Sequence, residues 1–242
     1  MSYINNIDGF LKQNRSFFEY LKEMEESLEH IPMKKIVEEA GGPENVAVIS
    51  VDVIEGFCRI GPLASPRVKA IIEPIVEILR KAYDLGVRNF VLPQDTHPED
   101  SPEFAHFPPH CVEETEEAET VREFKELPFF NLMKVIQKRS INSGIDTDLE
   151  EWLLEKNPKK IIVLGDCTDL CTYHLALHVK LFGNAKGYHW EVIVPDNAIA
   201  TYDLPVDIAK KIGATPHPGD LLHIIFLYHM KLNGINAVRE IV

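Results

Sequence analysis

Two cysteines, Cys167 and Cys171, stand four positions apart in the stretch VLGDCTDLCTYHLAL, residues 163–177. Three residues separate them, one more than in the usual Cys-x-x-Cys metal or redox motif, and no second pair stands elsewhere in the chain. The pattern changes from strand-like to helix-like between them, so Cys171 is expected at a helix N-terminus, where the dipole favours the reactive thiolate. The stretch predicts a nucleophilic cysteine, with a small buried apolar residue as the alternative.

A second group of reactive side chains lies in QDTHPEDSPEFAHFPPHCVEET, residues 94–115. The possible metal ligands in it are Asp95, His97, Glu103, His106 and His110. Asp95 and His97 are two apart at the end of an expected strand, so their side chains point to the same side and both reach one ion. Carboxylate and imidazole ligands suit zinc, manganese or iron(II) and leave positions open for water or substrate. The segment predicts a divalent metal site, with surface histidines as the alternative.

Asp52 and Lys138 supply an acid and a cation for the same chemistry, since each closes a mostly apolar run, VAVISVD and LMKVIQK. An aspartate beside a thiol accepts its proton and later delivers it to a leaving amine, as a base and then an acid. A neighbouring lysine favours the charged form of the thiol. The alternatives are a turn-forming aspartate and a solvated lysine.

The elements that position these groups alternate between strands and helices along the chain. Mostly apolar runs of strand length are expected at residues 46–52, 89–95, 132–138, 160–166 and 190–196. Helical patterns fall at residues 65–86, 146–156 and 170–184. This alternation predicts an α/β fold, a mainly parallel sheet flanked by helices on both faces, with the ligand beyond the carboxyl ends of the strands. Asp52, Asp95, Lys138 and Cys171 then meet at one edge.

Helix ends are also readable in the sequence. In the first helical pattern, Ser65 is a candidate N-cap and Gly86 a candidate C-cap. Pro74 inside that pattern predicts either a kink or a late start. Thr147 and Glu150 resemble a capping box at the start of the second helix.

The length and net charge of the chain limit its domain organisation and its possible partners. The 242 residues are enough for one large domain, expected at residues 45–242, and residues 1–44 are expected to form an N-terminal helical extension. A net charge of −13 argues against nucleic acid as a partner, although a local basic patch would escape this average. We find no run of eighteen apolar residues, no signal peptide and no phosphate-binding glycine motif, so we expect a cytoplasmic protein with no membrane contact and no nucleotide cofactor.

Five segments carry a family resemblance, in chain order VISVDVIEGF, DTHPEDSPEFAHFPPHCVEETEE, VIQKRSINSG, VLGDCTDLCTYHLAL and VPDNAIATYDLP. With them, most of residues 45–205 resembles the isochorismatase-like cysteine hydrolases and, among these, the nicotinamidases. The tail from ATYDLP to FLYHM and the stretch VDVIEGFCRIG are similar to plant-type nicotinamidases and their bacterial relatives.

The resemblance assigns roles to the catalytic candidates. It implies that Asp52 is the proton-transfer acid, Lys138 the catalytic lysine and Cys171 the nucleophile. It also implies a cis peptide between Asp166 and Cys167, with the backbone N–H groups of Cys167 and Cys171 forming an oxyanion hole. A nucleophilic cysteine is absent from true isochorismatases, so Cys171 argues against vinyl-ether hydrolysis.

The resemblance also implies a metal and a substrate. Asp95, His97 and His110 match metal ligands, zinc being the first expectation and manganese or iron the others, and Glu103 matches a position that reaches the ion directly or through water. In the implied reaction a pyridine nitrogen binds the metal and holds a carboxamide over the nucleophile, so that nicotinamide becomes nicotinate and ammonia. Phe57 or Phe104 is expected to sandwich the ring, with a place in the hydrophobic core as the alternative for each.

Two alternatives stay open at this point. One is a hydrolase of another small carboxamide or carbamoyl compound, and the other is a non-catalytic binding module that keeps the fold and the metal site. Glu55 and Gly56 replace the Asn and Asp of the DxQNDF pattern of many relatives, so the contacts around Asp52 are expected to differ. The family also implies a homo-oligomer, with the N-terminal helix and the LLHIIFLYHM segment as candidate contacts. The alternative is that both segments complete the core of the monomer.

Overall fold

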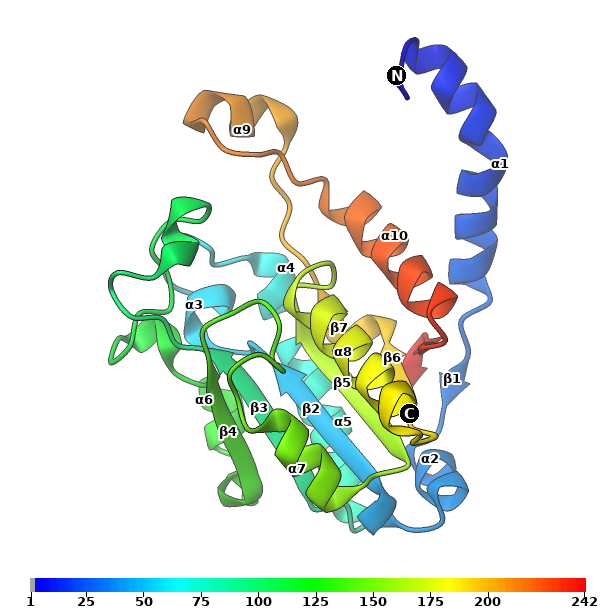
Figure 1. Cartoon of the computed structure of the whole chain (residues 1–242), viewed down its shortest axis with the longest axis vertical. Helices are drawn as coiled ribbons and strands as arrows, with labels where there is room; N and C mark the ends of the chain where they lie inside the picture. Colours follow the sequence, from blue (N-terminus) through cyan, green and yellow to red (C-terminus); the bar gives the residue numbers. More distant parts are fainter. Residues whose placement is uncertain (1–2) are drawn as a thin grey trace.

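The structure is a computed structural model that describes residues 3–242. Its centre is a seven-stranded sheet with the strand order β4-β3-β2-β5-β6-β8, and β7 pairs with β5 beside this path (Figure 1). The strands are β2 (Val46–Val51), β3 (Asn89–Asp95), β4 (Met133–Lys138), β5 (Lys160–Asp166), β6 (Glu191–Pro195), β7 (Ile199–Ala200) and β8 (Asn236–Val238). All pairings between them are parallel, which confirms the predicted fold class.

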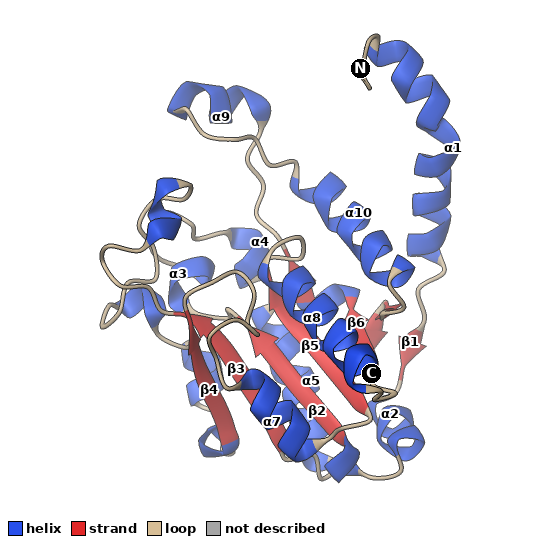
Figure 2. Cartoon of the chain, in the orientation of Figure 1, coloured by secondary structure: helices blue, strands red, loops and turns tan. Residues whose placement is uncertain are grey.

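Helices cover both faces of this sheet, as the colouring by secondary structure shows (Figure 2). One face packs against α2 (Met33–Ala40), α4 (Pro66–Lys69) and α5 (Ile72–Asp84), and the other against α7 (Leu149–Lys156), α8 (Cys171–Lys186) and α10 (Gly219–Leu232). In β2, Val46 and Val48 belong to the first core while Ala47 and Ile49 belong to the second. Because successive strand residues point to opposite faces, an all-apolar β2 serves two cores at once.

The remaining short helices follow the strands on the side of their carboxyl ends. They are α3 (Glu55–Cys58), α6 (Arg122–Lys125) and α9 (Val206–Ile212). In Figure 1, α9 projects from the body of the molecule at the tip of a long excursion between β7 and α10. The carboxyl ends of the strands are therefore the side of the sheet on which the loops are longest.

The predicted helix ends have mixed outcomes. Ser65 caps α4, because its Oγ accepts a hydrogen bond from Arg67 N at 3.3 Å. The expected long helix is split, and Pro74 lies in the first turn of α5, where a missing N–H costs little, so the late start is confirmed. The capping box between Thr147 and Glu150 is not formed, because Asp148 is the N-cap of α7. Thr147 still lies at the start of this helix: its Oγ1 accepts a hydrogen bond from Leu149 N at 3.3 Å, and its hydroxyl donates to Ser143 O at 2.6 Å.

The N-terminal segment contacts the rest of the chain in two ways. The long helix α1 (Ile7–Glu26) lies beside α10, where the Phe17 and Tyr228 ring centroids are 5.1 Å apart (Figure 1). Strand β1 (His30–Ile31) pairs with β9 (Glu240–Ile241), and α2 adds buried side chains to the first core. The domain boundary at residue 45 stays a prediction. Within residues 3–242, no helix is both long enough and apolar enough to cross a membrane.

Candidate active site

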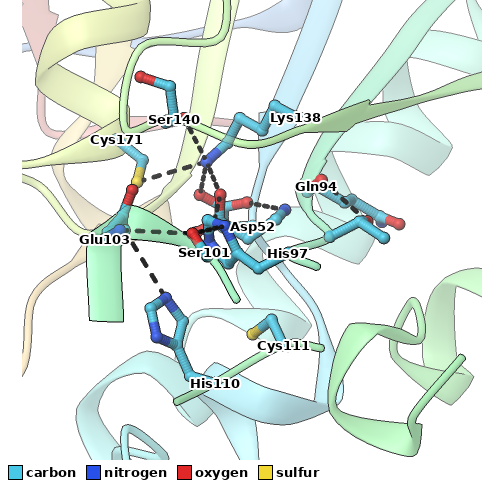
Figure 3. Close-up of polar contacts among 12 residues, drawn as sticks. Asp52, Gln94, His97, Ser101, Glu103, His110, Cys111, Lys138, Ser140 and Cys171 are labelled. Atoms are coloured by element: carbon cyan, nitrogen blue, oxygen red, sulfur yellow. Dashed lines mark hydrogen bonds and ion pairs between the residues drawn. The ribbon is translucent and has the colours of Figure 1, made fainter. Parts of the chain in front are cut away.

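The polar groups predicted at the strand ends meet at one edge of the sheet. Asp95 and Lys138 are register partners at the ends of β3 and β4, and Asp52 directly follows β2. Cys171 is the first residue of α8, which begins after β5. Figure 3 shows the side chains of Asp52 and Cys171 close to the Lys138 ammonium group. The rule that parallel strands place functional groups at their carboxyl ends therefore holds for this chain.

Lys138 is the centre of a buried charge network. Its Nζ lies 2.8 Å from Asp52 Oδ2 and 2.5 Å from Asp95 Oδ1, and it donates to Ser140 O at 3.2 Å and to Cys171 Sγ at 3.6 Å. Asp52 Oδ1 also accepts a hydrogen bond from Asp95 N at 2.8 Å. Burial lowers the pKa of Lys138, but the two carboxylates raise it more, so its pKa stands well above the usual value. The lysine therefore stays charged.

Protonation of the acid and the thiol follows from the same surroundings. Burial, together with the charge of Asp95, raises the pKa of Asp52 to about 7 against the opposing effect of Lys138. Burial also raises the pKa of Cys171, and the charges of Asp52 and Asp95 add to this, while Lys138 lowers it. Lys138 lowers the pKa of Cys171 as expected, but burial and the two carboxylates raise it more. Cys171 is therefore a thiol in the resting protein. A thiol needs a base, and Asp52 titrates near neutral pH.

A second cluster joins the first at Asp95. Ligand atoms of Asp95, His97, Glu103 and His110 all lie within 4.8 Å of one another. His97 Nε2 is 3.6 Å from Asp95 Oδ1, and His110 Nε2 is 3.9 Å from Glu103 Oε1. His106 is exposed and belongs to no such cluster among the described residues. Four of the five possible ligands in the segment are thus brought together.

The donor set fits a divalent cation. His97 Nε2 is buried and has no hydrogen-bond partner among residues 3–242. His110 Nδ1 lies 2.9 Å from Pro108 O, and because a carbonyl only accepts, Nδ1 carries the hydrogen and Nε2 keeps its lone pair for the cluster. For His97, the neighbour of Nδ1 is Ser101 Oγ at 3.5 Å, as Pro108 O is the neighbour of Nδ1 in His110. Metal-ligating histidines are oriented in this way by a partner on the other ring nitrogen.

A cavity beside both clusters contains about 500 Å³ of empty space, including its opening to solvent. Its polar lining comprises Asp95, Glu103, His110, Asp166, Cys167 and Cys171, and its apolar lining comprises Phe57, Leu63, Val68, Phe107, Ile141, Leu170 and Tyr202. A reacting group in this cavity lies next to the thiol and the metal cluster at once. Most of the apolar lining was not predicted, because the sequence pattern does not show which apolar residues of loops and helix ends face the cavity.

The two predicted aromatic residues differ in position. Phe57 lines the cavity, but Phe104 does not. The Phe104 ring packs instead against the rings of His97 and His110, with centroids 5.6 Å away in each case. Phe104 therefore supports two metal-ligand candidates, and Phe57 is the aromatic group of this pair that a substrate can touch.

The turn between β5 and α8 carries the predicted oxyanion donors. The peptide bond between Asp166 and Cys167 is cis. Among residues 3–242, no backbone carbonyl accepts a hydrogen bond from the N–H of Cys167 or of Cys171. Both residues line the cavity. Their N–H groups are thus left over for a ligand, as an oxyanion hole requires.

The residues that depart from the family pattern have local explanations. The Glu55 carboxylate pairs with Arg59 Nη1 at 3.0 Å and accepts from Arg122 N at 3.3 Å, so it is engaged away from Asp52. A Cβ at Gly56 would lie 2.8 Å from Cys111 Sγ and from Glu117 O. Gly56 therefore permits a close approach between α3 and the loop that follows His110.

Known proteins resemble the chain over most of its length. Residues 46–207 match the isochorismatase domain. Nicotinamidase 1 of Arabidopsis thaliana is 32% identical over 216 residues, which is 81% of this chain and 86% of that protein. The structure of a Pyrococcus horikoshii pyrazinamidase in complex with zinc shares 26% identity with a TM-score of 0.63, covering 81% of this chain and 99% of that one. Nicotinamidase from Bacillus subtilis superposes with a TM-score of 0.62 at 24% identity, over 80% of this chain and 99% of that one.

A thiol, a carboxylate, a lysine and four possible metal ligands meet at the edge of a parallel sheet, an arrangement that fits a cysteine hydrolase. The chain belongs to the isochorismatase family.

Proposed function

We propose that the protein is an amidohydrolase that converts nicotinamide to nicotinate and ammonia. The observation that carries this proposal is the shared cavity, in which Cys171 lies beside the Asp95 metal cluster and within 3.6 Å of Lys138 Nζ. The similarity to a plant nicotinamidase supports the choice of substrate.

The proposed reaction starts with a proton transfer from the Cys171 thiol to Asp52. The sulfur then attacks the carboxamide carbon, and the negative charge that develops on the carbonyl oxygen is stabilised by the N–H groups of Cys167 and Cys171. Asp52 returns the proton to the nitrogen, the C–N bond breaks, and ammonia leaves a thioester on Cys171. Water attacks the thioester with Asp52 again as the base, which releases nicotinate and the thiol.

Lys138 holds the partners of this proton transfer in place. Its ammonium group contacts Asp52, Asp95 and Cys171 together, so it orients the base and stabilises the thiolate as that charge develops. In this account the thiolate forms only when substrate is present. Holding reacting groups at contact distance in this way lowers the entropic part of the barrier.

Asp95, His97, His110 and Glu103 would hold a divalent metal ion, and we propose zinc. When bound, the ion supplies a Lewis-acid position for a ring nitrogen. The chain's own contribution is to aim the His97 and His110 Nε2 lone pairs at that position and to provide the apolar wall, including Phe57, against which a planar ring lies.

We also propose a homo-oligomer. The projecting helix α9 exposes Val206, Ile208 and Ile212 at 52%, 41% and 66%. Ile208 and Ile212 are one helical turn apart and share a face, and exposed apolar side chains that gather on one face are typical of a protein contact surface. Light scattering of the purified protein, which gives its molar mass in solution, tests this proposal. The cytoplasmic location stays a prediction.

Benzamide tests the proposed substrate, because it keeps the shape and the carboxamide of nicotinamide but lacks the ring nitrogen. We expect kcat/KM for ammonia release to be at least about 10⁴-fold higher with nicotinamide, the range found when a site built for a polar contact meets an analogue that lacks it. Equal rates with both amides would remove the role of the metal cluster in binding. Faster release from a carbamoyl compound than from nicotinamide would replace the proposed substrate by the alternative within the family.

A further inference from the structure

Two histidines from the C-terminal part of the chain hold the turn that carries the nucleophile. His217 precedes α10 and His223 lies within it, and both are beyond residues 46–207, which match the family domain. Their partners are Asp169 and Thr168, which lie between Cys167 and Cys171. A segment outside the matched domain thus reaches the centre of the active site.

His217 makes three contacts that tie the turn to the cavity wall. Its Nε2 lies 2.8 Å from Asp169 Oδ2, and its Nδ1 lies 2.9 Å from Tyr202 O. The imidazole also stacks on the Tyr202 ring, with centroids 3.7 Å apart and an angle of 18° between the planes. Asp169 Oδ1 accepts a further hydrogen bond from Thr201 Oγ1 at 2.6 Å. The Asp169 carboxylate is therefore fixed at both oxygens.

His223 fixes the neighbouring residue. Its Nδ1 lies 2.9 Å from Thr168 Oγ1, and its Nε2 lies 2.8 Å from Asp196 Oδ1. The other oxygen of Asp196 accepts from Arg239 Nη1 at 2.6 Å. Because a carboxylate only accepts, His223 Nε2 is a donor to Asp196, and this bond sets the direction of the ring toward the turn.

The position of the held residues makes these contacts relevant to catalysis. Three residues separate the two proposed oxyanion donors, and two of the three are anchored by a histidine. Thr168 is fully buried and also donates its backbone N–H to Ala200 O at 2.8 Å. A shift of the backbone at Thr168 or Asp169 would change the distance between the N–H groups of Cys167 and Cys171. A misplacement of about 1 Å in an active site can cost about 100-fold in rate.

We propose that His217 and His223 are positioning residues that fix the spacing of the two oxyanion donors. The inference rests on the proposed function, because it concerns the charge that develops on the carbonyl oxygen of an amide. If the proposal is correct, loss of either histidine weakens binding of the transition state and leaves binding of nicotinamide nearly unchanged. The reason is that the oxyanion exists only after the Cys171 sulfur has attacked the carboxamide carbon.

His217→Phe and His223→Phe test the inference, because phenylalanine keeps a ring against its neighbours and removes the hydrogen bonds. His217→Gln and His223→Gln keep an amide near the Nε2 position and serve as conservative variants if the first pair folds poorly. His229→Phe is the matched control: His229 lies on the same helix α10 and its Nδ1 is 2.9 Å from Tyr173 OH on α8, but it does not touch the turn.

The readouts are kcat for ammonia release, the dissociation constant of nicotinamide measured in a Cys171→Ala background, and the inhibition constant of pyridine-3-carboxaldehyde. With this aldehyde the Cys171 sulfur bonds to the carbonyl carbon, the π pair moves onto the oxygen, and the thiol proton passes to Asp52. The adduct therefore carries the oxyanion that the turn binds. It reports on the oxyanion hole separately from ground-state binding.

We expect kcat to fall about 10- to 100-fold in both Phe variants, with a parallel loss of aldehyde affinity. The nicotinamide dissociation constant should stay within about 3-fold, the Gln variants should retain more activity, and His229→Phe should match the wild type. Unchanged kcat in the folded variants, or a loss of kcat without a loss of aldehyde affinity, would overturn the inference alone. A wild-type protein that releases no ammonia would overturn the proposed function and the inference with it.

Discussion

Replacing Lys138 by methionine removes the cation that lies between two buried carboxylates. Asp52 and Asp95 are 1% and 2% exposed, and Lys138 Nζ lies 2.8 Å from one and 2.5 Å from the other. Removal of one partner from a buried ion pair costs about 3–5 kcal/mol, because the remaining charge has no compensation. We expect Lys138→Met to lower the free energy of unfolding by this amount at pH 8, measured by urea denaturation with a chelator present.

The loss should depend on pH because Asp52 can take up a proton. Its pKa in the folded protein is raised to about 7, above its ordinary value of 3.8, so the folded state binds more protons than the unfolded state between these values. Stability therefore falls as pH rises through this range, and loss of Lys138 strengthens the effect. Between pH 6 and 8 we expect the destabilisation to grow by up to about 1.4 kcal/mol per pH unit.

The double variant Lys138→Met/Asp52→Asn is the control for this explanation. With Asp52 neutral, one carboxylate is left without a cation instead of two, and the double variant should be more stable than Lys138→Met at pH 8. A loss below about 1 kcal/mol in Lys138→Met, independent of pH, would refute the reasoning. So would a double variant that is less stable than the single one.

Three further predictions follow from other contacts. Burial raises the pKa of Asp169, but His217 and Thr201 lower it more, so its pKa in the folded protein is below the ordinary value. In urea denaturation at neutral pH, the free energy of unfolding of the wild type should exceed that of Asp169→Asn by about 1–3 kcal/mol, and this difference should shrink as pH falls below about 4. A difference that persists below that pH would contradict the prediction. Ser101→Ala should weaken zinc affinity about 10-fold in calorimetric titration, because Ser101 Oγ faces His97 Nδ1, and unchanged affinity would remove that role. Gly56→Ala should lower the free energy of unfolding by about 1–3 kcal/mol, since its Cβ would lie 2.8 Å from Glu117 O, and a neutral effect would show that the loop yields.

Much of the site was predictable because its polar residues end apolar strands. Asp52, Asp95 and Lys138 could be placed at one edge from the strand pattern alone, since parallel strands end on the same side. The strands β2, β3, β4, β5 and β6 were predicted because each is a mostly apolar run of five to seven residues. The strands β1, β7, β8 and β9 have only two or three residues each, too few for an apolar run to stand out.

The rest depends on tertiary contacts that no local pattern encodes. The thiol of Cys171 is held protonated by burial and by the carboxylates of Asp52 and Asp95, which together outweigh the effect of Lys138 on its pKa. His217 meets Asp169 across 48 positions of sequence, and no spacing rule connects them. Phe104 lies among predicted ligands but turns toward their rings, because the short 3₁₀ helix Pro102–Ala105 sets its direction.

Ammonia release from nicotinamide by zinc-loaded protein, with Cys171→Ala and Cys167→Ala compared side by side, decides whether Cys171 is the nucleophile of an amidohydrolase. Cys167 lines the same cavity and is the matched control, because its proposed role uses only its backbone N–H. We expect rapid release by the wild type, release within about 10-fold of it by Cys167→Ala, and a loss of at least about 10⁴-fold in Cys171→Ala, as for other lost nucleophiles. Undiminished release by Cys171→Ala would contradict the account.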